Sequence, residues 1–358
     1  MELSPAQERM LEERVIDMEG PGTILRDFES LLDFLQERRV RPTEKLRLLP
    51  LRVLPEVNAR MTHPLQLGLQ RPQQKSFPHI NGLYLLIRSA GLTRVDEHGN
   101  RPRLVIDEEV YQRWAELNPT ERYFNLLETW LLRARPETIG ERGWGIFPVW
   151  ETYSRWLVLF LEAREGGLPI ADAETESSLR YYPGWHNLGL MDLFGLVSVE
   201  DRMSAPGEGW RIKRVKTEPF GDALLSPLHR DFFADVENFR LSQEVKRMPV
   251  GSLQPVLQPY FPAWERNLRV PEWIFREGTH IFRVSLPKMW WCRIAIPSSS
   301  TLETLASAIL DAVAFTHDHL YQFSYQNRFG VDDCVYHPYM DKGPWADAAF
   351  ISCSLPSA

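Results

Sequence analysis

Cysteine is scarce in this chain of 358 residues. Its three cysteines, Cys292, Cys334 and Cys353, lie far apart, and no two of them form a C-x-x-C motif. This spacing favours neither a disulfide framework nor a zinc knuckle, and a chain without disulfides suits a reducing compartment. We therefore expect a cytoplasmic protein.

Long hydrophobic runs are also missing. The longest apolar stretch, Trp156 to Leu161, is far too short to span a bilayer, and no basic segment followed by an apolar run opens the chain. The sequence thus predicts a protein that is neither exported nor embedded, and no membrane partner is expected.

The motifs of several enzyme classes are absent as well. The chain contains no G-x-x-x-x-G-K-[ST], no G-x-G-x-x-G after a strand, no G-x-S-x-G and no H-E-x-x-H. Nucleotide, dinucleotide, serine-hydrolase and zinc-protease chemistry therefore lack their usual residues. The carboxylates are too scattered to suggest a general acid and base, so we lean towards a non-enzymatic protein and expect no cofactor.

The composition is that of an ordinary soluble globular protein, with 44% hydrophobic and 25% charged residues. The length allows roughly two or three domains. The formal charge of -7 argues against wholesale coating of nucleic acid, because phosphate binding needs a surplus of Lys and Arg. Any contact with nucleic acid must come from a local basic patch.

Residues 1–72 are predicted to form a helical N-terminal region. Ser4, Pro5 and Gln7 have the spacing of a capping box, which predicts a helix from there to about Met18. A second, amphipathic helix is indicated by apolar residues at helical spacing, namely Ile24, Phe28, Leu31, Leu32 and Leu35. A third helix is expected near Pro55 to Met61, after a basic connector that contains Arg38, Arg39, Arg41, Lys45, Arg47 and Arg52.

One pattern occurs twice in the middle of the chain, in residues 73–165 and 166–275. The first copy has an apolar helix Gly82–Ala90, a strand to Val95, a strand Arg103–Ile106 and a helix from Asp107. The second has an apolar helix Leu188–Phe194, a strand to Val199, a strand Trp210–Val215 and a helix opened by Thr217. In each copy a Gly-Leu pair, Gly91-Leu92 or Gly195-Leu196, joins the first helix to the hairpin. The order of helix, Gly-Leu pair, hairpin and helix is that of a winged-helix fold, so we predict two winged-helix-like units.

Other segments frame these units. Asn118 and Glu121 form a second capping box before a helix with a buried stripe at Tyr123, Phe124, Leu127, Trp130 and Leu131. A further helix is expected from about Trp150 to Ala163, and the acidic stretch Asp172 to Glu176 is interpreted as a linker. A proline-rich connector, with Pro255, Pro259, Pro262 and Pro271, places a domain boundary near residue 275.

The helices before the hairpins are poor candidates for reading a base sequence. In winged-helix proteins that bind DNA this helix enters the major groove and needs cationic or amide side chains. The first offers only Arg88 and the second an acid, Asp192. The hairpins are better candidates for sequence-independent phosphate contact, through Arg94, Arg101, Arg103, Arg211, Lys213, Arg214 and Lys216. The alternatives are that these are ordinary solvated strand faces, or that the units are scaffolds for protein docking.

Residues 276–358 carry the most specific local signals. Trp290 to Pro297 reads W-W-C-R-I-A-I-P, Phe315 to Phe323 reads F-T-H-D-H-L-Y-Q-F, and His337-Pro338-Tyr339-Met340-Asp341 and Gly343-Pro344-Trp345 follow. These segments resemble the plasmid pRiA4b ORF-three-like family, some members of which are labelled insertion-sequence passenger or "TnpR" proteins. The resemblance implies a β-grasp-like α+β module, whose helix is capped by Thr301, and an association with mobile elements. It implies no transferable activity.

The module resembles the family only in part. After Trp345 the chain lacks the later strands that the resemblance implies, so we expect a module cut short by a frameshift or an early stop; the alternative is a naturally short variant. The face expected to carry Ile281, Val284 and Ile296 would then lose cover, which predicts lower stability than that of a complete relative, or completion by a partner chain or by self-association.

Two further hypotheses concern reactive side chains in this module. His317 and His319 could place two imidazoles on one side of a strand, with Asp332, Asp333 and His337 as further metal ligands. The alternative, which we favour, is a hydrogen-bonded His319 and a solvent-facing His317, so no metal site is predicted. Ser298, Ser299 and Ser300 have only Arg293 nearby in sequence, which does not support a serine recombinase.

The sequence thus predicts an α+β, multidomain protein without a catalytic site. The expected function is that of a non-enzymatic, mobile-element-associated or regulatory protein with weak, sequence-independent contact to nucleic acid through the hairpins and the basic connector. The alternative is a protein-interaction scaffold that binds no nucleic acid.

Overall fold

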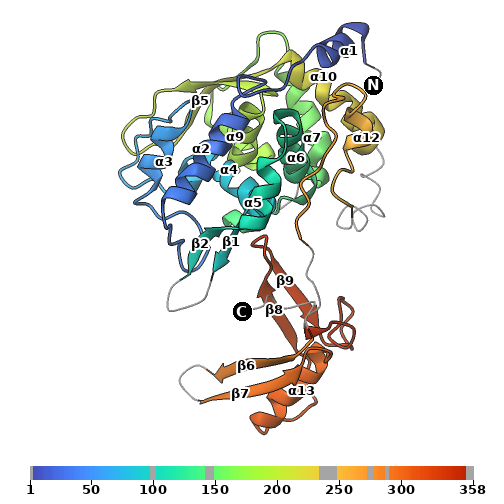
Figure 1. The fold of residues 1–358 in the computed structure, drawn as a ribbon. Helices are drawn as coiled ribbons and strands as arrows, with labels where there is room; N and C mark the ends of the chain where they lie inside the picture. Colours follow the sequence, from blue (N-terminus) through green and yellow to red (C-terminus); the bar gives the residue numbers. More distant parts are fainter. Residues whose placement is uncertain are drawn as a thin grey trace. The chain divides into compact units, whose positions relative to one another are not determined.

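The structure is a computed structural model that describes residues 3–96, 102–141, 149–233, 248–271, 277–286 and 290–351. It combines helices with small antiparallel sheets, which confirms the α+β class. The chain divides into two compact units, residues 1–270 and 271–358 (Figure 1). The sequence placed this boundary near residue 275, and its finer division into four parts stays a prediction.

Helices dominate the first unit. Its α-helices are α1 (Pro5–Glu12), α2 (Ile24–Glu37), α3 (Leu54–Arg60), α4 (Pro78–Ser89), α5 (Glu108–Ala115), α6 (Pro119–Glu128), α7 (Val149–Glu162), α8 (Ala173–Leu179), α9 (Trp185–Leu193), α10 (Pro219–Leu228) and α12 (Gln254–Leu257). Short helices of other pitch are η1 (Gln74–Ser76), η2 (Thr129–Arg133), η3 (Pro136–Ile139), η5 (Arg180–Gly184) and η6 (His229–Phe233).

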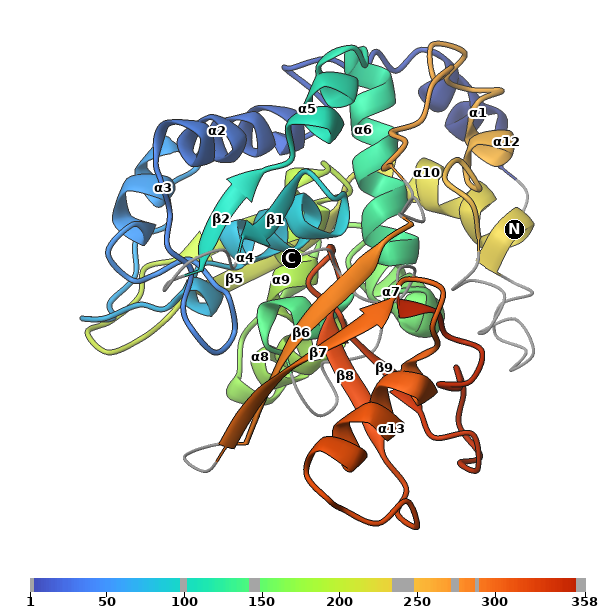
Figure 2. The ribbon, with the colours of Figure 1, turned by 60° about the horizontal axis from the view of Figure 1, so that its bottom comes forward.

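In the described part of the first unit, two small sheets accompany these helices. The first is the antiparallel hairpin of β1 (Thr93–Asp96) and β2 (Arg103–Ile106), which lies beside α2 (Figure 2). The second has the strand order β3-β5-β4, with β3 (Leu168–Pro169), β4 (Val197–Arg202) and β5 (Arg211–Thr217), all antiparallel. The repeated order of helix, hairpin and helix is therefore present as α4-β1-β2-α5 and as α9-β4-β5-α10.

Local capping chemistry explains several helix starts. The side chain of Ser4 accepts a hydrogen bond from the Gln7 N–H and that of Asn118 accepts one from the Glu121 N–H, and both capping boxes are complete. Such caps satisfy backbone donors that have no partner inside the helix. Both caps were predicted from the sequence and are confirmed.

Three sequence-based boundaries are wrong. The helix α1 stops at Glu12 instead of about Met18, and the chain then turns at Asp17, whose carboxylate accepts the Glu19 and Gly20 N–H groups. The acidic stretch interpreted as a linker instead caps and opens α8, where Asp172 accepts the Thr175 N–H at 2.7 Å. Thr217 ends β5 instead of opening a helix, and its hydroxyl donates to the Phe160 carbonyl.

The core of the first unit is one continuous hydrophobic cluster that runs from Leu3 to Leu268. At its centre α4 and α9 lie side by side (Figure 1). Glycines allow the two helices to approach closely. A Cβ added at Gly82 would lie 2.6 Å from Leu190 Cγ, and a Cβ added at Gly189 would lie 3.0 Å from the backbone nitrogen of His79. The two helix–hairpin–helix segments therefore share one core.

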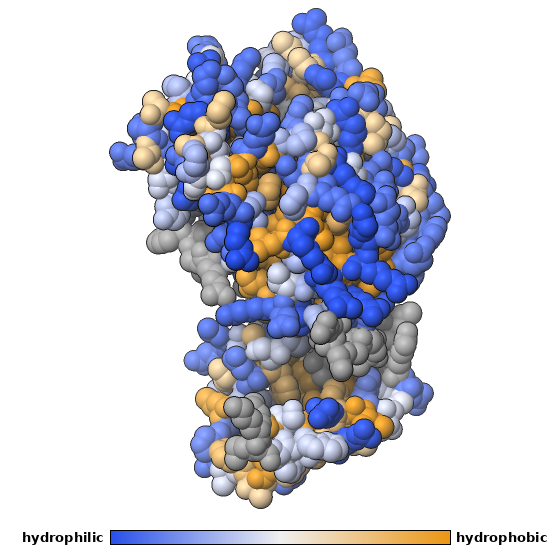
Figure 3. Space-filling model, turned by 90° about the vertical axis from the view of Figure 1, so that its left-hand side faces the viewer, coloured by the Kyte–Doolittle hydropathy of each residue, from blue (hydrophilic) through white to orange (hydrophobic). Residues whose placement is uncertain are grey.

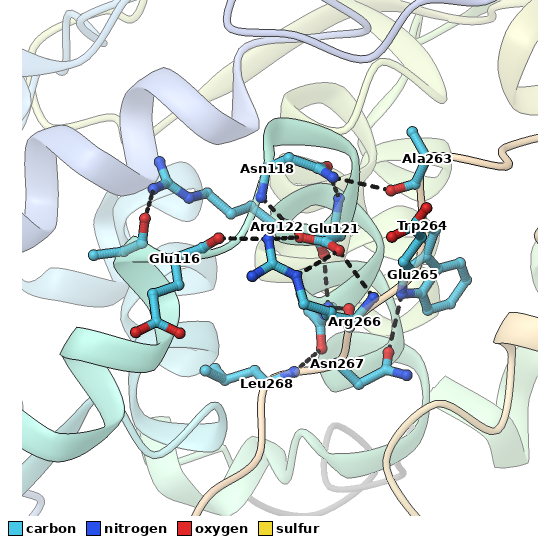
Figure 4. A network of polar contacts seen from close by, with 12 residues as sticks. Glu116, Asn118, Glu121, Arg122, Ala263, Trp264, Glu265, Arg266, Asn267 and Leu268 are labelled. Atoms are coloured by element: carbon cyan, nitrogen blue, oxygen red, sulfur yellow. Dashed lines mark hydrogen bonds and ion pairs between the residues drawn. The ribbon is translucent and has the colours of Figure 1, made fainter.

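The proline-rich segment 248–268 is fixed to α6 by a polar network (Figure 4). The carboxylate of Glu121, 1% exposed, accepts hydrogen bonds from the backbone N–H of Arg266 at 2.9 Å and from its guanidinium at 3.0 Å and 3.1 Å. Asn125 accepts the Leu268 N–H, and the Trp264 ring stacks on Phe124 at a centroid distance of 4.8 Å. This segment, read from the sequence as a connector, is thus part of the first unit.

The second unit contains β6 (Thr279–Leu286), β7 (Trp290–Pro297), α13 (Leu302–Ala312), β8 (Gln322–Gln326) and β9 (Asp332–Tyr336). The strands form two antiparallel hairpins, β6-β7 and β8-β9. Thr301 accepts the Thr304 N–H and begins α13, as predicted. The helix packs on the first hairpin through Leu302 and Leu305, which share a small core with Ile296.

The predicted apolar face of this hairpin is wrong in one residue. Ile281, expected beside Val284 and Ile296, has the opposite parity along β6 and is 69% exposed. Because side chains alternate across a strand, Phe282 and Ile294 take the position towards the core instead. Ile281 shares its outer face with Trp291, which is 57% exposed.

The surface is mixed in character. In the face shown in Figure 3, hydrophilic residues predominate and hydrophobic residues lie between them. Among the described residues, no helix has both the length and the apolar composition needed to cross a membrane.

Candidate functional site

The first hairpin presents its predicted cations on an outward face. Arg94 stands opposite Val105 and Arg103 opposite Asp96, so Arg94 and Arg103 share one face of the β1-β2 ladder. Leu104, on the other face, is buried. Both arginines are exposed and form no ion pair with another described residue. The third predicted cation, Arg101, lies outside the described residues.

The second hairpin carries four cations on the outer face of β5. Ile212, Val215 and Thr217 point inward and are buried. The pairing with β4 shifts register between Glu200 and Asp201, because Lys213 is an extra residue in β5. This bulge lets the consecutive residues Lys213 and Arg214 both face outward. Arg211 and Lys216 lie on the same outer face.

Two of these four cations are already compensated. Arg211 bonds to Glu176 at 2.6 Å and to Glu208 at 2.8 Å, and these bonds raise the pKa of its guanidinium. Lys213 bonds to Glu200 at 2.5 Å, and the ammonium group holds the pKa of the Glu200 carboxyl below its usual value. The positive potential of the face is therefore reduced at these two positions.

Arg214 and Lys216 keep more of their charge available. Both are exposed, and neither forms an ion pair with another described residue. Glu200 stands opposite Arg214 in the strand register, but its ion pair is with Lys213. The structure thus separates the predicted site residues of this hairpin into a paired set and an unpaired set, which the sequence did not distinguish.

The helices in front of the hairpins are buried. Every residue of α4 is buried, including Arg88, whose guanidinium is 3.4 Å from the Tyr84 hydroxyl. Asp192 of α9 bonds to His79 at 3.1 Å and accepts the Val199 N–H at 3.0 Å. Arg88 is therefore enclosed in the interior of the first unit, and Asp192 is held by His79 and the Val199 backbone.

The basic connector is largely exposed but partly paired. Arg38 bonds to Glu56 at 2.8 Å, and Arg47 also has a partner. Other connector cations have exposed side chains and no ion pair within the described part of the chain: Arg39, Arg41, Lys45 and Arg52.

A cavity of about 510 Å³ lies under the loop between β4 and β5. It is lined by five parts of the chain: residues 75–81 around η1 and the start of α4, Glu141, Thr152 of α7, residues 180–187 across η5 and the start of α9, and residues 207–211. Arg211 and Glu208 of the second hairpin form one side. The cavity therefore adjoins the predicted interface.

Aromatic side chains and charges share the walls of this cavity. Trp185 and Trp210 meet edge to face at a centroid distance of 5.4 Å, and the Arg180 guanidinium lies 5.9 Å from the Trp185 ring. Burial raises the pKa of the Glu141 carboxyl, and Lys75 opposes this shift. Burial also lowers the pKa of His186 to about 4, so its ring is neutral near pH 7.

Sequence reasoning missed this cavity. Its residues come from segments far apart in the chain, and none of the segments alone has a recognised motif. The local signal was the aromatic run Tyr181, Tyr182 and Trp185 around Pro183, at the end of a helix that had been read as a linker. Such a run is also compatible with ordinary packing, so it did not identify a site.

His317 and His319 of the second unit lie outside its strands. His317 bonds to Asp311 at 2.9 Å and His319 to Asp318 at 2.7 Å, and both side chains are largely exposed. Across the described residues, no group of three or more His, Cys, Asp or Glu side chains is placed to hold a metal ion. Ser298 is buried and its hydroxyl bonds to the backbone of Gly278.

Comparisons of the chain with models of protein families, with curated proteins and with solved structures produce no match.

Proposed function

We propose that this chain is a non-enzymatic, mobile-element-associated or regulatory protein that contacts nucleic acid weakly and without sequence preference. The contact is made by the outer faces of the two hairpins, in two winged-helix-like units. The observation that carries the proposal is the set of exposed cations without an ion-pair partner among the described residues, Arg94, Arg103, Arg214 and Lys216, on outward strand faces.

The arrangement supports phosphate contact and disfavours base reading. The helices that would enter a major groove are buried, so their side chains are not available to base edges. Strand cations can contact the phosphate backbone of any sequence. Pairing of Arg211 and Lys213 with carboxylates reduces the number of cations available, which favours weak binding.

The association with mobile elements comes from the resemblance of residues 276–358 to the plasmid pRiA4b ORF-three-like family, together with the β-grasp-like module that it implies. The helix α13 packed on the β6-β7 hairpin is compatible with such a module. The assignment remains a proposal.

The test measures binding of a labelled duplex of arbitrary sequence as a function of salt concentration. Each phosphate contact should contribute about 0.9 to the slope of log K against log salt. Lys216→Gln is expected to lower the slope by about one contact. Lys213→Gln is the matched control, because Lys213 lies on the same strand face but is paired with Glu200; its effect should be smaller. Equal effects of the two variants would contradict the proposal.

A protein-interaction scaffold is the second candidate. It is favoured by exposed apolar side chains on the outer face of the β6-β7 hairpin, Ile281 at 69% and Trp291 at 57% exposure. The same titration separates the two: a wild-type chain that binds no duplex at low salt removes the first function and leaves the scaffold.

A further inference from the structure

The cavity under the β4-β5 loop is lined by two cations that form no ion pair with another described residue. Arg180 and Lys75 line it, and neither forms an ion pair with another described residue. Arg211, which also lines the cavity, is held by Glu176 and Glu208. The two unpaired cations leave the cavity suited to an anionic group.

Two carboxylates, Glu141 and Glu208, also line the cavity. Glu208 is occupied by Arg211 at 2.8 Å and by the Ala205 N–H at 2.9 Å. Glu141 accepts no hydrogen bond from a described residue; burial raises the pKa of its carboxyl, and the positive charge of Lys75 opposes this shift. A ligand with N–H donors would satisfy the Glu141 carboxyl.

Aromatic rings form another part of the wall. Tyr181 is 56% exposed, Trp185 is half-buried, and both line the cavity with Tyr182. Such rings bind flat heterocycles by stacking, and Arg180 beside Trp185 can add a cation–π contact. A planar ring is therefore the apolar part of the ligand that this wall fits.

A neutral buried histidine completes the polar groups. His186 is 4% exposed, and its Nε2 atom has no hydrogen-bond partner among the described residues. His186 lies in the first turn of α9, where the helix dipole favours negative charge nearby. A polar ligand at this wall would meet an imidazole that remains uncharged near neutral pH.

We propose that this cavity binds a nucleotide, as a planar nitrogen heterocycle that carries a phosphate group. Arg180 and Lys75 contact the phosphate, the rings of Tyr181 and Trp185 contact the base, and Glu141 accepts its N–H groups. The volume of about 510 Å³ falls within the range of about 300–1,000 Å³ that is common for small-molecule sites. No phosphate loop is involved, since side chains supply the charge.

A planar heterocycle with a phosphate group occurs both in a free mononucleotide and in each nucleotide of a single-stranded nucleic acid. The proposal goes beyond the hairpin contact and does not depend on it. The experiment is isothermal titration calorimetry of the full chain with the common nucleoside monophosphates, with a plain nucleoside, with inorganic phosphate and with a short single-stranded oligonucleotide.

At least one nucleoside monophosphate is expected to bind. The affinities of the corresponding nucleoside and of inorganic phosphate should each be at least about tenfold lower, because the nucleoside lacks the phosphate contacts and inorganic phosphate lacks the base contacts. Tighter binding of the oligonucleotide than of the monophosphate, lost in Arg180→Gln, assigns the site to a strand. Binding of the monophosphate at least as tight assigns it to a free nucleotide.

Substitutions at exposed positions keep the test independent of folding. Arg180→Gln should weaken monophosphate binding by roughly tenfold, equivalent to about 1.4 kcal/mol. Tyr181→Ala should weaken it several-fold, whereas Tyr181→Phe keeps the ring and should not. Arg9→Gln is the control: Arg9 is exposed on α1 and does not line the cavity, so this substitution should leave monophosphate binding unchanged.

Three results would overturn the proposal. The first is no detectable binding of any monophosphate by the folded wild-type chain. The second is equal affinity of the wild type, Arg180→Gln and Tyr181→Ala. The third is tighter binding of a cationic aromatic probe, tryptamine, because unpaired cations in the wall should repel it.

Discussion

Truncation of Glu121 to alanine is expected to destabilise the first unit by about 3 kcal/mol. This carboxylate is 1% exposed and joins α6 to the segment 263–268. It accepts two backbone N–H groups, that of Asn118 at 2.8 Å and that of Arg266 at 2.9 Å. Truncation removes both acceptors and leaves a void.

The magnitude follows from these two bonds. A hydrogen bond to a charged group contributes about 1.5–3 kcal/mol, and both donors are only partly buried, so the lower end applies to each. The Arg266 side chain is 53% exposed and is rehydrated on truncation, so its bonds to Glu121 are left out of the sum. Glu121→Gln keeps the shape and an acceptor, and should cost about 1 kcal/mol.

The assay is urea unfolding followed by tryptophan fluorescence, with hydrogen exchange of the segment 263–268 as a local measurement. The matched control is Glu109→Ala, which removes an exposed pair with Arg113 at 2.7 Å and should cost at most about 0.5 kcal/mol. The reasoning is refuted if Glu121→Ala is no more destabilising than Glu109→Ala, or if the Arg266 N–H exchanges no faster.

Two further predictions concern the buried interior. The pKa of His186 is about 4 in the folded chain against an ordinary value of 6.5, so between these pH values the unfolded chain binds a proton that the folded chain excludes. The free energy of unfolding should therefore fall as the pH is lowered from 6.5 to 4, by about 3 kcal/mol in total. Urea unfolding measured over this pH range should show a smaller loss in His186→Asn. Gly22→Ala should lower the free energy of unfolding by more than about 2 kcal/mol, because its φ is +65° and the new Cβ would lie 2.0 Å from the Leu193 carbonyl oxygen. The control is Gly207→Ala, where φ is +89° and no atom lies within 4 Å of the new Cβ. Equal shifts in Tm for the two variants would show that crowding is not the cause.

The sequence was most informative where structure depends on nearby residues. The capping boxes at Ser4 and Asn118, and the strand Arg103–Ile106, are set by residue types within a few positions, and the structure confirms them. The acidic stretch before α8 was misread because its charges suggested a solvated linker. Glu176 is instead buried against Arg211, a partner 35 positions away that the local pattern could not reveal.

The candidate site was predictable only in part. Alternation along β5 correctly places Ile212 inward, but the bulge at Lys213 and the pairing of Lys213 with Glu200 depend on β4. The cavity depends on segments between residues 75 and 211 that meet only after folding. The sequence pattern therefore predicts which face of a strand carries the cations. Which of these cations form ion pairs depends on residues that are brought together only by folding.

The glycine contact between α4 and α9 limits how this protein could have been assembled in evolution. Each helix has a notch at Gly82 or Gly189 that is filled by the other, and both helices belong to one hydrophobic cluster. If the two halves descend from a duplication, the ancestor had to pair with a second copy of itself to fill the notch. A laboratory fragment that carries one half would accordingly be expected to dimerise or to aggregate.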